Sequence, residues 1–320
     1  MTSSPAAPSS IPSIHGQSPH QQGQDCPAGQ QDQPQHDRND ERQSSPSNSP
    51  TTKAGESATL PHPKLRLHVQ DLRHPASSAF LSLLPNVESV LDTALAAIIE
   101  HLYTSTAVSK PVTNTPLSPF TPTVPPTRSV TLVLRDFEGV AYTTGTELDD
   151  DHKEIHFSLS YIHSTCRGNP DPVKELTGVL THELVHCYQH TAPKGTAAPH
   201  PPGGLIEGIA DFVRLKADLE PPHWKRPSSA KDRASRWDQG YQHTAYFLAW
   251  LEDVRIGRGA IGLLNDRLLR TGYTGEEGGD DKDQQRISFW KGLFGADVLE
   301  LWEEYGRYLD EGNEIQRLQS

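Results

Sequence analysis

Two histidines and a glutamate lie close together in the stretch Thr181 to His190, which reads THELVHCYQH. His182, Glu183 and His186 form the pattern H-E-x-x-H. In a helix, residues four apart share one face and lie about 6 Å apart along the axis, so both imidazole rings can reach one metal ion. Neutral imidazoles suit zinc, and Glu183 points about 100° round the helix, where it can hold a water without acting as a ligand. The pattern therefore predicts a hydrolytic zinc site.

A third ligand is needed, because catalytic zinc takes three protein ligands and keeps a fourth position for water. His190 is unsuitable, since it would lie roughly 12 Å along the same helix from His182. Residues 203–216 (GGLIEGIADFVRLK) predict a second helix, with Glu207 and Asp211 four apart on one face. One of these carboxylates can complete the site, while the other accepts the free N–H of a liganding imidazole.

Four stretches of the chain resemble the plant basic secretory protein family and its fungal and bacterial relatives: THELVHCYQH, GGLIEGIADFVRLKA, WDQGYQHTAYFLAWLED and EIHFSLSYI. The resemblance runs from about Lys64 to about Leu309. It implies a zinc peptidase domain of the gluzincin type, with Zn²⁺ as cofactor and a peptide or protein as substrate. By this resemblance Glu183 is the general base, and Asp211 hydrogen-bonds a metal-binding side chain without binding the metal itself. The metal ligands that it implies are His182, His186 and Glu207.

Hydrolysis also needs a donor for the oxygen that becomes negative in the transition state. The candidate is Tyr241, at the start of a predicted helix reading GYQHTAYFLAW, and His243 is the substitute. For both side chains, ordinary packing is the alternative role. Two other functions remain open: a zinc-bearing module that binds a peptide or another ligand without turnover, and an interaction protein whose N-terminal segment carries the function.

The composition of the chain predicts one folded domain behind a disordered segment. Residues 1–60 are dominated by Ser, Pro, Gln, Asp, Asn and Gly, and they lack the apolar side chains that would offset the entropy of ordering. Residues 61–320 are predicted to form a zincin-like α+β domain. A small mixed α/β half, residues 61–190, carries the H-E-x-x-H helix, and an all-helical half follows at residues 191–320.

Local periodicity predicts the elements that position these residues. The predicted strands are Lys64–Val69, Ser129–Arg135, Val140–Thr144 and Glu154–Ile162. The free edge of the last strand could pair with an extended substrate, although an ordinary sheet strand is the equal alternative. The predicted helices are Pro85–Tyr103, Asp171–His190, residues 203–216, Gly240–Val254, Ala260–Arg270, Gln285–Phe294 and Ala296–Leu309.

The net charge of −12, with no basic stripe, argues against a nucleic-acid or anionic-membrane partner. No apolar run of about 18 residues exists, so no membrane span is expected. The protein is expected to be a monomer. The first residues, MTSSPAAPSSIPSIHG, lack the basic start and apolar segment of a signal peptide. This predicts an intracellular protein, with export by an unconventional route as the alternative. Cys187 is expected to be a buried thiol that faces away from the metal.

Overall fold

The computed structural model describes residues 61–105, 120–275 and 288–319. Contacts divide the chain into two units, Met1–Glu56 and Ser57–Ser320, and the elements below belong to the second. The predicted disordered segment, residues 1–60, lies outside the described residues. So do residues 106–119 of the Pro- and Thr-rich stretch and residues 276–287 of the acidic turn.

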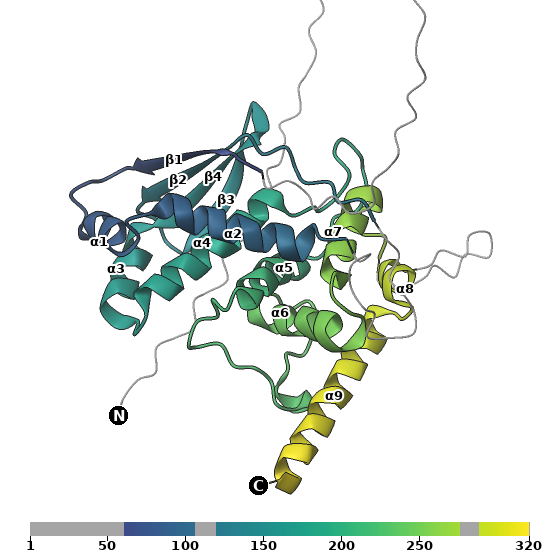
Figure 1. Ribbon diagram of the computed structural model, residues 1–320. Helices are drawn as coiled ribbons and strands as arrows, with labels where there is room; N and C mark the ends of the chain where they lie inside the picture. Colours follow the sequence, from purple (N-terminus) through teal and green to yellow (C-terminus); the bar gives the residue numbers. More distant parts are fainter. Residues whose placement is uncertain (1–60, 106–119, 276–287, 320) are drawn as a thin grey trace, which may run out of the picture. The chain divides into compact units, whose positions relative to one another are not determined.

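A four-stranded sheet with the order β1-β2-β4-β3 forms one layer (Figure 1). Strand β2 pairs in parallel with both β1 and β4, whereas β3 pairs antiparallel with β4. The strands are β1 (Lys64–Val69), β2 (Ser129–Arg135), β3 (Ala141–Thr146) and β4 (Asp149–Ser158). The predictions for β1 and β2 match residue for residue, and β3 begins one residue later and ends two residues later than predicted.

Strand β4 corrects two predictions. The predicted strand Glu154–Ile162 ends at Ser158, and helix α3 (Leu159–Gly168) begins there, because the Ser158 hydroxyl accepts from Tyr161 N and caps the helix. Leu159 and Ile162 are buried in the helix, so the apolar pattern continued while the conformation changed. The predicted free edge was also wrong, since β4 lies between β2 and β3. The edge strand on this side of the sheet is β3.

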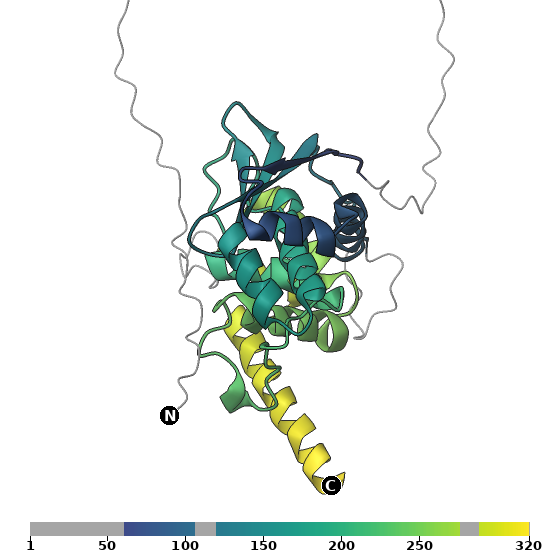
Figure 2. The same ribbon diagram turned by 90° about the vertical axis from the view of Figure 1, so that its left-hand side faces the viewer.

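Helices α2 (Val87–Leu102) and α4 (Pro172–Tyr188) lie on one side of the sheet (Figures 1 and 2). The Asn86 side chain caps α2 by accepting from Ser89 N. The buried residues of α2 include Leu91, Leu95, Ile98 and Leu102, which recur at helical spacing. Helix α1 (Pro75–Leu83) was not predicted; it begins where the His74 ring accepts from Ala76 N. Both long helices were predicted slightly too long at their ends.

Every regular element that the structure describes after α4 is helical. The prediction for α5 (Gly203–Lys216) matches residue for residue. The predicted helix Gly240–Val254 is instead α6 (Tyr241–Trp250) followed by a π-helical turn (Leu251–Arg255). The remaining helices are a short 3₁₀ turn (Ala230–Asp232), α7 (Ala260–Thr271), α8 (Phe289–Phe294) and α9 (Val298–Gln319). This mixture of one small sheet and many helices confirms the α+β class.

No single helix in the described ranges is long and apolar enough to cross a bilayer. Helices α1 and α2 satisfy that length and composition requirement only as a pair, which is bent by 64° at the break between them. Buried core helices meet the same requirement, and α2 has several buried residues: Leu91, Ala94, Leu95, Ile98, Ile99 and Leu102.

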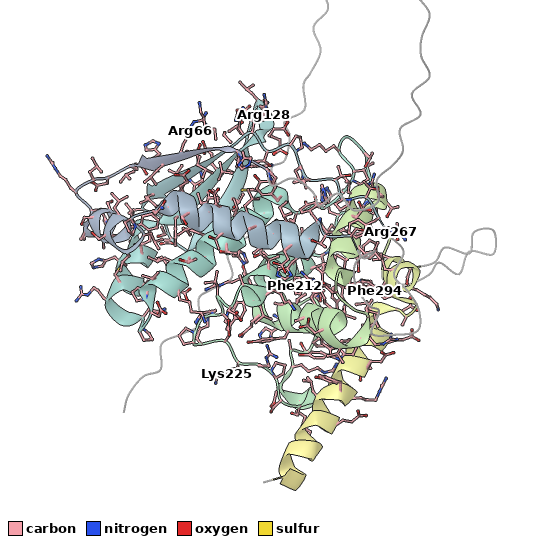
Figure 3. The ribbon with its side chains drawn as sticks, in the orientation of Figure 1. Arg66, Arg128, Phe212, Lys225, Arg267 and Phe294 are labelled. Atoms are coloured by element: carbon pink, nitrogen blue, oxygen red, sulfur yellow. The ribbon has the colours of Figure 1, made fainter. Side chains whose placement is uncertain are left out.

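Helices α5 and α6 approach closely because glycines line their contact. A Cβ on Gly208 would lie 2.3 Å from Thr244 Cγ2, and a Cβ on Gly204 would lie 1.8 Å from Asp238 O. Phe212, labelled in Figure 3, lies one turn farther along α5, is fully buried and contacts His101 of α2 edge to face. The close crossing fixes where α6 begins relative to α5, and therefore where Tyr241 lies.

Replacing Gly208 with alanine is expected to lower the free energy of unfolding by about 1–2 kcal/mol. Overpacking lowers the free energy of unfolding by about 1–3 kcal/mol, and the higher helix propensity of alanine offsets up to about 1 kcal/mol of that loss. The matched control is Gly312→Ala in α9, where an added Cβ meets nothing within 4 Å. That variant should be slightly stabilised. Urea unfolding measures both, and equal stabilities of Gly208→Ala and Gly312→Ala would contradict the close crossing.

Candidate metal and catalytic site

Helix α4 presents His182, Glu183 and His186 at the base of the site. Asp171 caps the helix by accepting from Lys174 N, and Pro172 occupies its first turn, where a missing N–H costs nothing. His182 and Glu183 are buried and His186 is half-buried. The Nε2 atoms of the two histidines lie 3.1 Å apart, so the rings converge on one point as their spacing predicts.

Helix α5 brings Glu207 to the same point. Its Oε2 lies 3.1 Å from His182 Nε2 and 3.7 Å from His186 Nε2. Among the described residues, His182, His186 and Glu207 form the one cluster whose donor atoms are close enough together to hold a metal ion. Zinc bonds of about 2.0–2.1 Å place tetrahedral ligands about 3.3 Å apart, so the three separations fit such a site.

Asp211, one turn after Glu207, supports His182 from behind. Its Oδ1 lies 2.6 Å from His182 Nδ1, and the carboxylate is almost completely buried. An ionised carboxylate only accepts, so Nδ1 carries the proton and Nε2 faces the cluster. Residue spacing alone did not say which carboxylate of α5 lies in the cluster. In the structure Glu207 lies in it, and Asp211 contacts His182 from the other side.

The electrostatics of the cluster favour positive charge. Burial opposes protonation of His182, but the charge and hydrogen bond of Asp211 outweigh it and hold the pKa of His182 well above its usual value. Burial alone would raise the pKa of Glu207, yet hydrogen bonds from His182 and His186 lower it below its usual range. Glu207 is therefore ionised, and a cation between these groups would be stabilised.

Strand β3 reaches Glu183 through a residue that the sequence analysis did not single out. The hydroxyl of Thr143 lies 2.7 Å from Glu183 Oε2 and 2.9 Å from the Glu183 backbone oxygen. A hydroxyl has one hydrogen, so it donates to one of these two acceptors at a time. The edge strand of the sheet is thereby joined to the candidate base.

Gln189, the first residue after α4, contacts His186. Its Nε2 lies 3.0 Å from His186 Nδ1, and its Oε1 is buried with no hydrogen-bond partner among the described residues. Gln189 follows His186 by three residues, a spacing that places side chains on one helix face. The sequence contained this signal, whereas nothing local linked Thr143 to Glu183.

Tyr241 lies over the cluster at the first residue of α6. Its ring stacks on that of His182 at a centroid distance of 6.2 Å and an angle of 15°. Burial, followed by the charges of Glu207, Asp211 and Glu183, raises the pKa of Tyr241 to about 12, so its hydroxyl keeps a proton to donate. Its φ of 47° lies in the left-handed region, which is uncommon for an aromatic residue. No hydrogen bond or ion pair in the described part of the chain joins His243 to the cluster.

Two predicted non-ligands also have clear places. Cys187 is buried, and burial raises the pKa of its thiol above the usual range, as expected for a core cysteine. His190 is not part of the helix, because α4 ends at Tyr188; its ring Nε2 lies 2.8 Å from Thr123 O. The separation of roughly 12 Å along a helix, which excluded His190 as a third ligand, therefore does not hold. The ring instead contacts the loop that contains Thr123.

A buried ion pair fixes α4 against α5. Arg214 Nη2 donates to Glu175 Oε1 over 3.2 Å, and the Tyr161 hydroxyl donates to the same oxygen over 2.8 Å. Glu175 lies seven residues before His182, and Arg214 lies seven residues after Glu207, so the pair is two turns from the cluster along both helices. Gly178 leaves room for the guanidinium, since a Cβ there would lie 2.5 Å from Arg214 Nε. The pair helps to set the register in which His182 and Glu207 meet.

Comparison with known proteins agrees with the resemblance of the four sequence stretches. The profile of the family BSP, described as peptidase of plants and bacteria, matches residues 62–305. No curated protein and no solved structure matched the chain. The matched region contains the whole sheet, helices α4 and α5 and Tyr241. It covers well over half of the 320 residues, so the chain belongs to the BSP family, the peptidases of plants and bacteria.

Proposed function

We propose that the protein is a zinc-dependent peptidase in which His182, His186 and Glu207 hold the metal ion and Glu183 is the general base. The observation that carries the proposal is the mutual separation of the three donor atoms, 3.1, 3.1 and 3.7 Å. Two imidazoles and one carboxylate are a ligand set that catalytic zinc uses in peptidases, and it leaves a position for water. Membership of a peptidase family supports the same reaction.

The chemistry divides between the metal and the chain. Zn²⁺, when bound, lowers the pKa of water to about 7 and polarises a carbonyl oxygen. Glu183 accepts the proton of the attacking water and returns it to the leaving amine. Thr143 holds the Glu183 carboxylate, and Tyr241 donates its hydroxyl proton to the carbonyl oxygen as that oxygen becomes negative. Asp211 keeps His182 in the tautomer that can bind metal.

The edge strand β3 is the proposed place for the substrate backbone. Among the strands that the structure describes, it pairs with β4 alone, so its other side can hydrogen-bond an extended peptide. Thr143 belongs to this strand and contacts Glu183, so a peptide added along β3 would run past the base. This replaces the predicted pairing at β4, whose two edges are both occupied.

Metal content and cleavage measured together test the proposal. The purified full chain should contain about one zinc per chain and cleave a mixture of peptides, with both properties lost after chelation. His182→Ala and Glu207→Ala should each lose most of the zinc and all cleavage. Wild-type protein that binds zinc but cleaves nothing would instead support the non-catalytic binding module. Metal content unchanged in both variants would refute the proposed ligand set.

Thr143→Val is expected to lower kcat about 10–100-fold while leaving KM and zinc content nearly unchanged. Valine has the shape of threonine but cannot donate, and a hydrogen bond to a charged group is worth about 1.5–3 kcal/mol. Thr143→Ser keeps the hydroxyl and should retain most of the activity. A steady-state comparison of the two variants measures the effect, and equal losses in both would mean that the methyl group of Thr143 matters rather than its hydroxyl.

A further inference from the structure

We infer that Gln189 is a positioning residue that sets the tautomer of His186 and so tunes the metal affinity of the site. This inference rests on the metal site proposed above and adds a partner for its second imidazole. His182 has Asp211 behind it, at 2.6 Å from Nδ1, and Gln189 occupies the corresponding place behind His186, at 3.0 Å from Nδ1. Each imidazole thus has a hydrogen-bond partner on the nitrogen that faces away from the cluster.

The direction of the hydrogen bond decides whether His186 can bind metal. A neutral imidazole has one N–H and one lone pair. While the Gln189 amide N–H donates to Nδ1, the ring proton is on Nε2 and points into the cluster, where it blocks coordination. A half-turn about the Cγ–Cδ bond of Gln189 exchanges its oxygen and nitrogen. Oε1 then accepts from the Nδ1–H of His186, and the Nε2 lone pair faces the metal.

Gln189 Oε1 is available for that role. It is buried and has no hydrogen-bond partner among the described residues. When a cation takes the Nε2 lone pair, the ring proton of His186 moves to Nδ1, and this oxygen is the acceptor that Gln189 can offer to it. The amide can therefore serve both states of the site, donating when His186 is free and accepting when it is a ligand. Asp211 can only accept, so His182 is fixed in the metal-binding tautomer.

The side chain of Gln189 has a role separate from its backbone. Its backbone N–H donates to Val185 O over 2.7 Å and ends helix α4 whatever the side chain is. A substitution that keeps the length and removes the polar atoms, Gln189→Met, therefore preserves the helix end. Gln189→Glu keeps an acceptor and loses the donor, because an ionised carboxylate cannot donate. The two variants separate the accepting role from the donating one.

The test is the zinc affinity of the metal-free full chain, measured by competition with a chromophoric chelator. Gln189→Met should bind zinc about 10–100-fold more weakly than wild type, the usual effect of losing a partner behind a liganding histidine. Gln189→Glu should bind at least as tightly as wild type. Gln70→Met is the matched control at an exposed position after β1 and should bind as wild type does. Melting of the metal-free proteins shows whether the variants fold.

A second readout is the visible absorption of bound Co²⁺, which reports ligand geometry. It should change in Gln189→Met and remain close to wild type in Gln189→Glu. Wild-type affinity in Gln189→Met would overturn the inference and leave the proposed function standing. Weak binding by both variants would overturn the accepting role. A wild-type chain that binds no zinc would defeat the proposed function and this inference together.

Discussion

Replacing Glu183 with glutamine is expected to abolish peptide hydrolysis and to leave the bound zinc in place. The amide has the size of the carboxylate but cannot take a proton from water, and loss of a general base costs about 10²–10⁴-fold in rate. None of the proposed ligand atoms belongs to Glu183, whose Oε2 instead accepts from Thr143. Metal analysis and kcat/KM for a cleaved peptide, measured on the same preparation, check both halves of the expectation.

His182→Ala is the contrasting variant, because it should lose zinc and activity together. Glu183→Asp is an intermediate one, since it keeps a base but withdraws it by one methylene from Thr143 and from the water position. Residual hydrolysis in Glu183→Gln at the level of Glu183→Asp would falsify the assigned base. Loss of zinc from Glu183→Gln would show that this carboxylate belongs to the ligand set.

The elements predicted with correct ends are those whose signals are local. In β1 apolar and polar side chains alternate, and β2 is a short segment rich in Val and Leu. In α5 a Pro- and Gly-rich stretch precedes an amphipathic helix. Helix α1 lacked both signals, because its cap is a histidine ring and its nine residues contain several serines. Serine favours caps and turns in isolation, so tertiary packing decides that conformation.

The strand order could not be predicted, because it depends on pairing between distant segments. Nothing in β4 alone shows that β2 lies on one side of it and β3 on the other. Alternation of apolar and polar side chains indicates a half-buried strand, but it does not identify the strands with which that strand pairs. The change from strand to helix at Ser158 was hidden for a related reason. Leu159 and Ile162 suit the continuing strand pattern and the buried face of α3 equally well.

The site was predictable to the extent that its chemistry is local. Spacing of four residues brings His182 and His186 to one face, and the same spacing in α5 does so for Glu207 and Asp211. Which of these two carboxylates joins the cluster depends on the register of the helices, which the distant pair Glu175 and Arg214 helps to fix. The contact of Thr143 with Glu183 depends on the strand order, so it could not be read from the sequence.

A buried pair away from the cluster makes the stability of the protein depend on pH. Glu252, in the π-helical turn, is almost completely buried, and its Oε1 lies 4.0 Å from His101 Nδ1, which has no hydrogen-bond partner in the described ranges. Burial raises the pKa of Glu252 from 4.5 to about 7, against the hydrogen bond from Ile261 N. Burial also lowers the pKa of His101 from 6.5 to about 4. Both side chains are therefore neutral near pH 6.

The two shifts act on stability in opposite directions. The folded-state pKa of Glu252 lies above its unfolded value, so its contribution is present below pH 4.5 and is lost as the pH rises through 7, by about 3 kcal/mol. The folded-state pKa of His101 lies below its unfolded value, so its contribution is present above pH 6.5 and is lost by a similar amount as the pH falls through 4. Between pH 4.5 and 6.5 the two slopes offset each other.

Glu252→Gln is therefore expected to raise the free energy of unfolding by about 3 kcal/mol at pH 8 and by less than about 1 kcal/mol at pH 5. Glutamine stays neutral at every pH, can accept from Ile261 N and can donate towards His101 Nδ1. Urea unfolding at several pH values between 5 and 8 measures the difference. The control Glu147→Gln, at an exposed position, should change stability little at either pH. Equal stability of Glu252→Gln and wild type at pH 8 would show that Glu252 is ionised there without cost, as the partner of a charged His101.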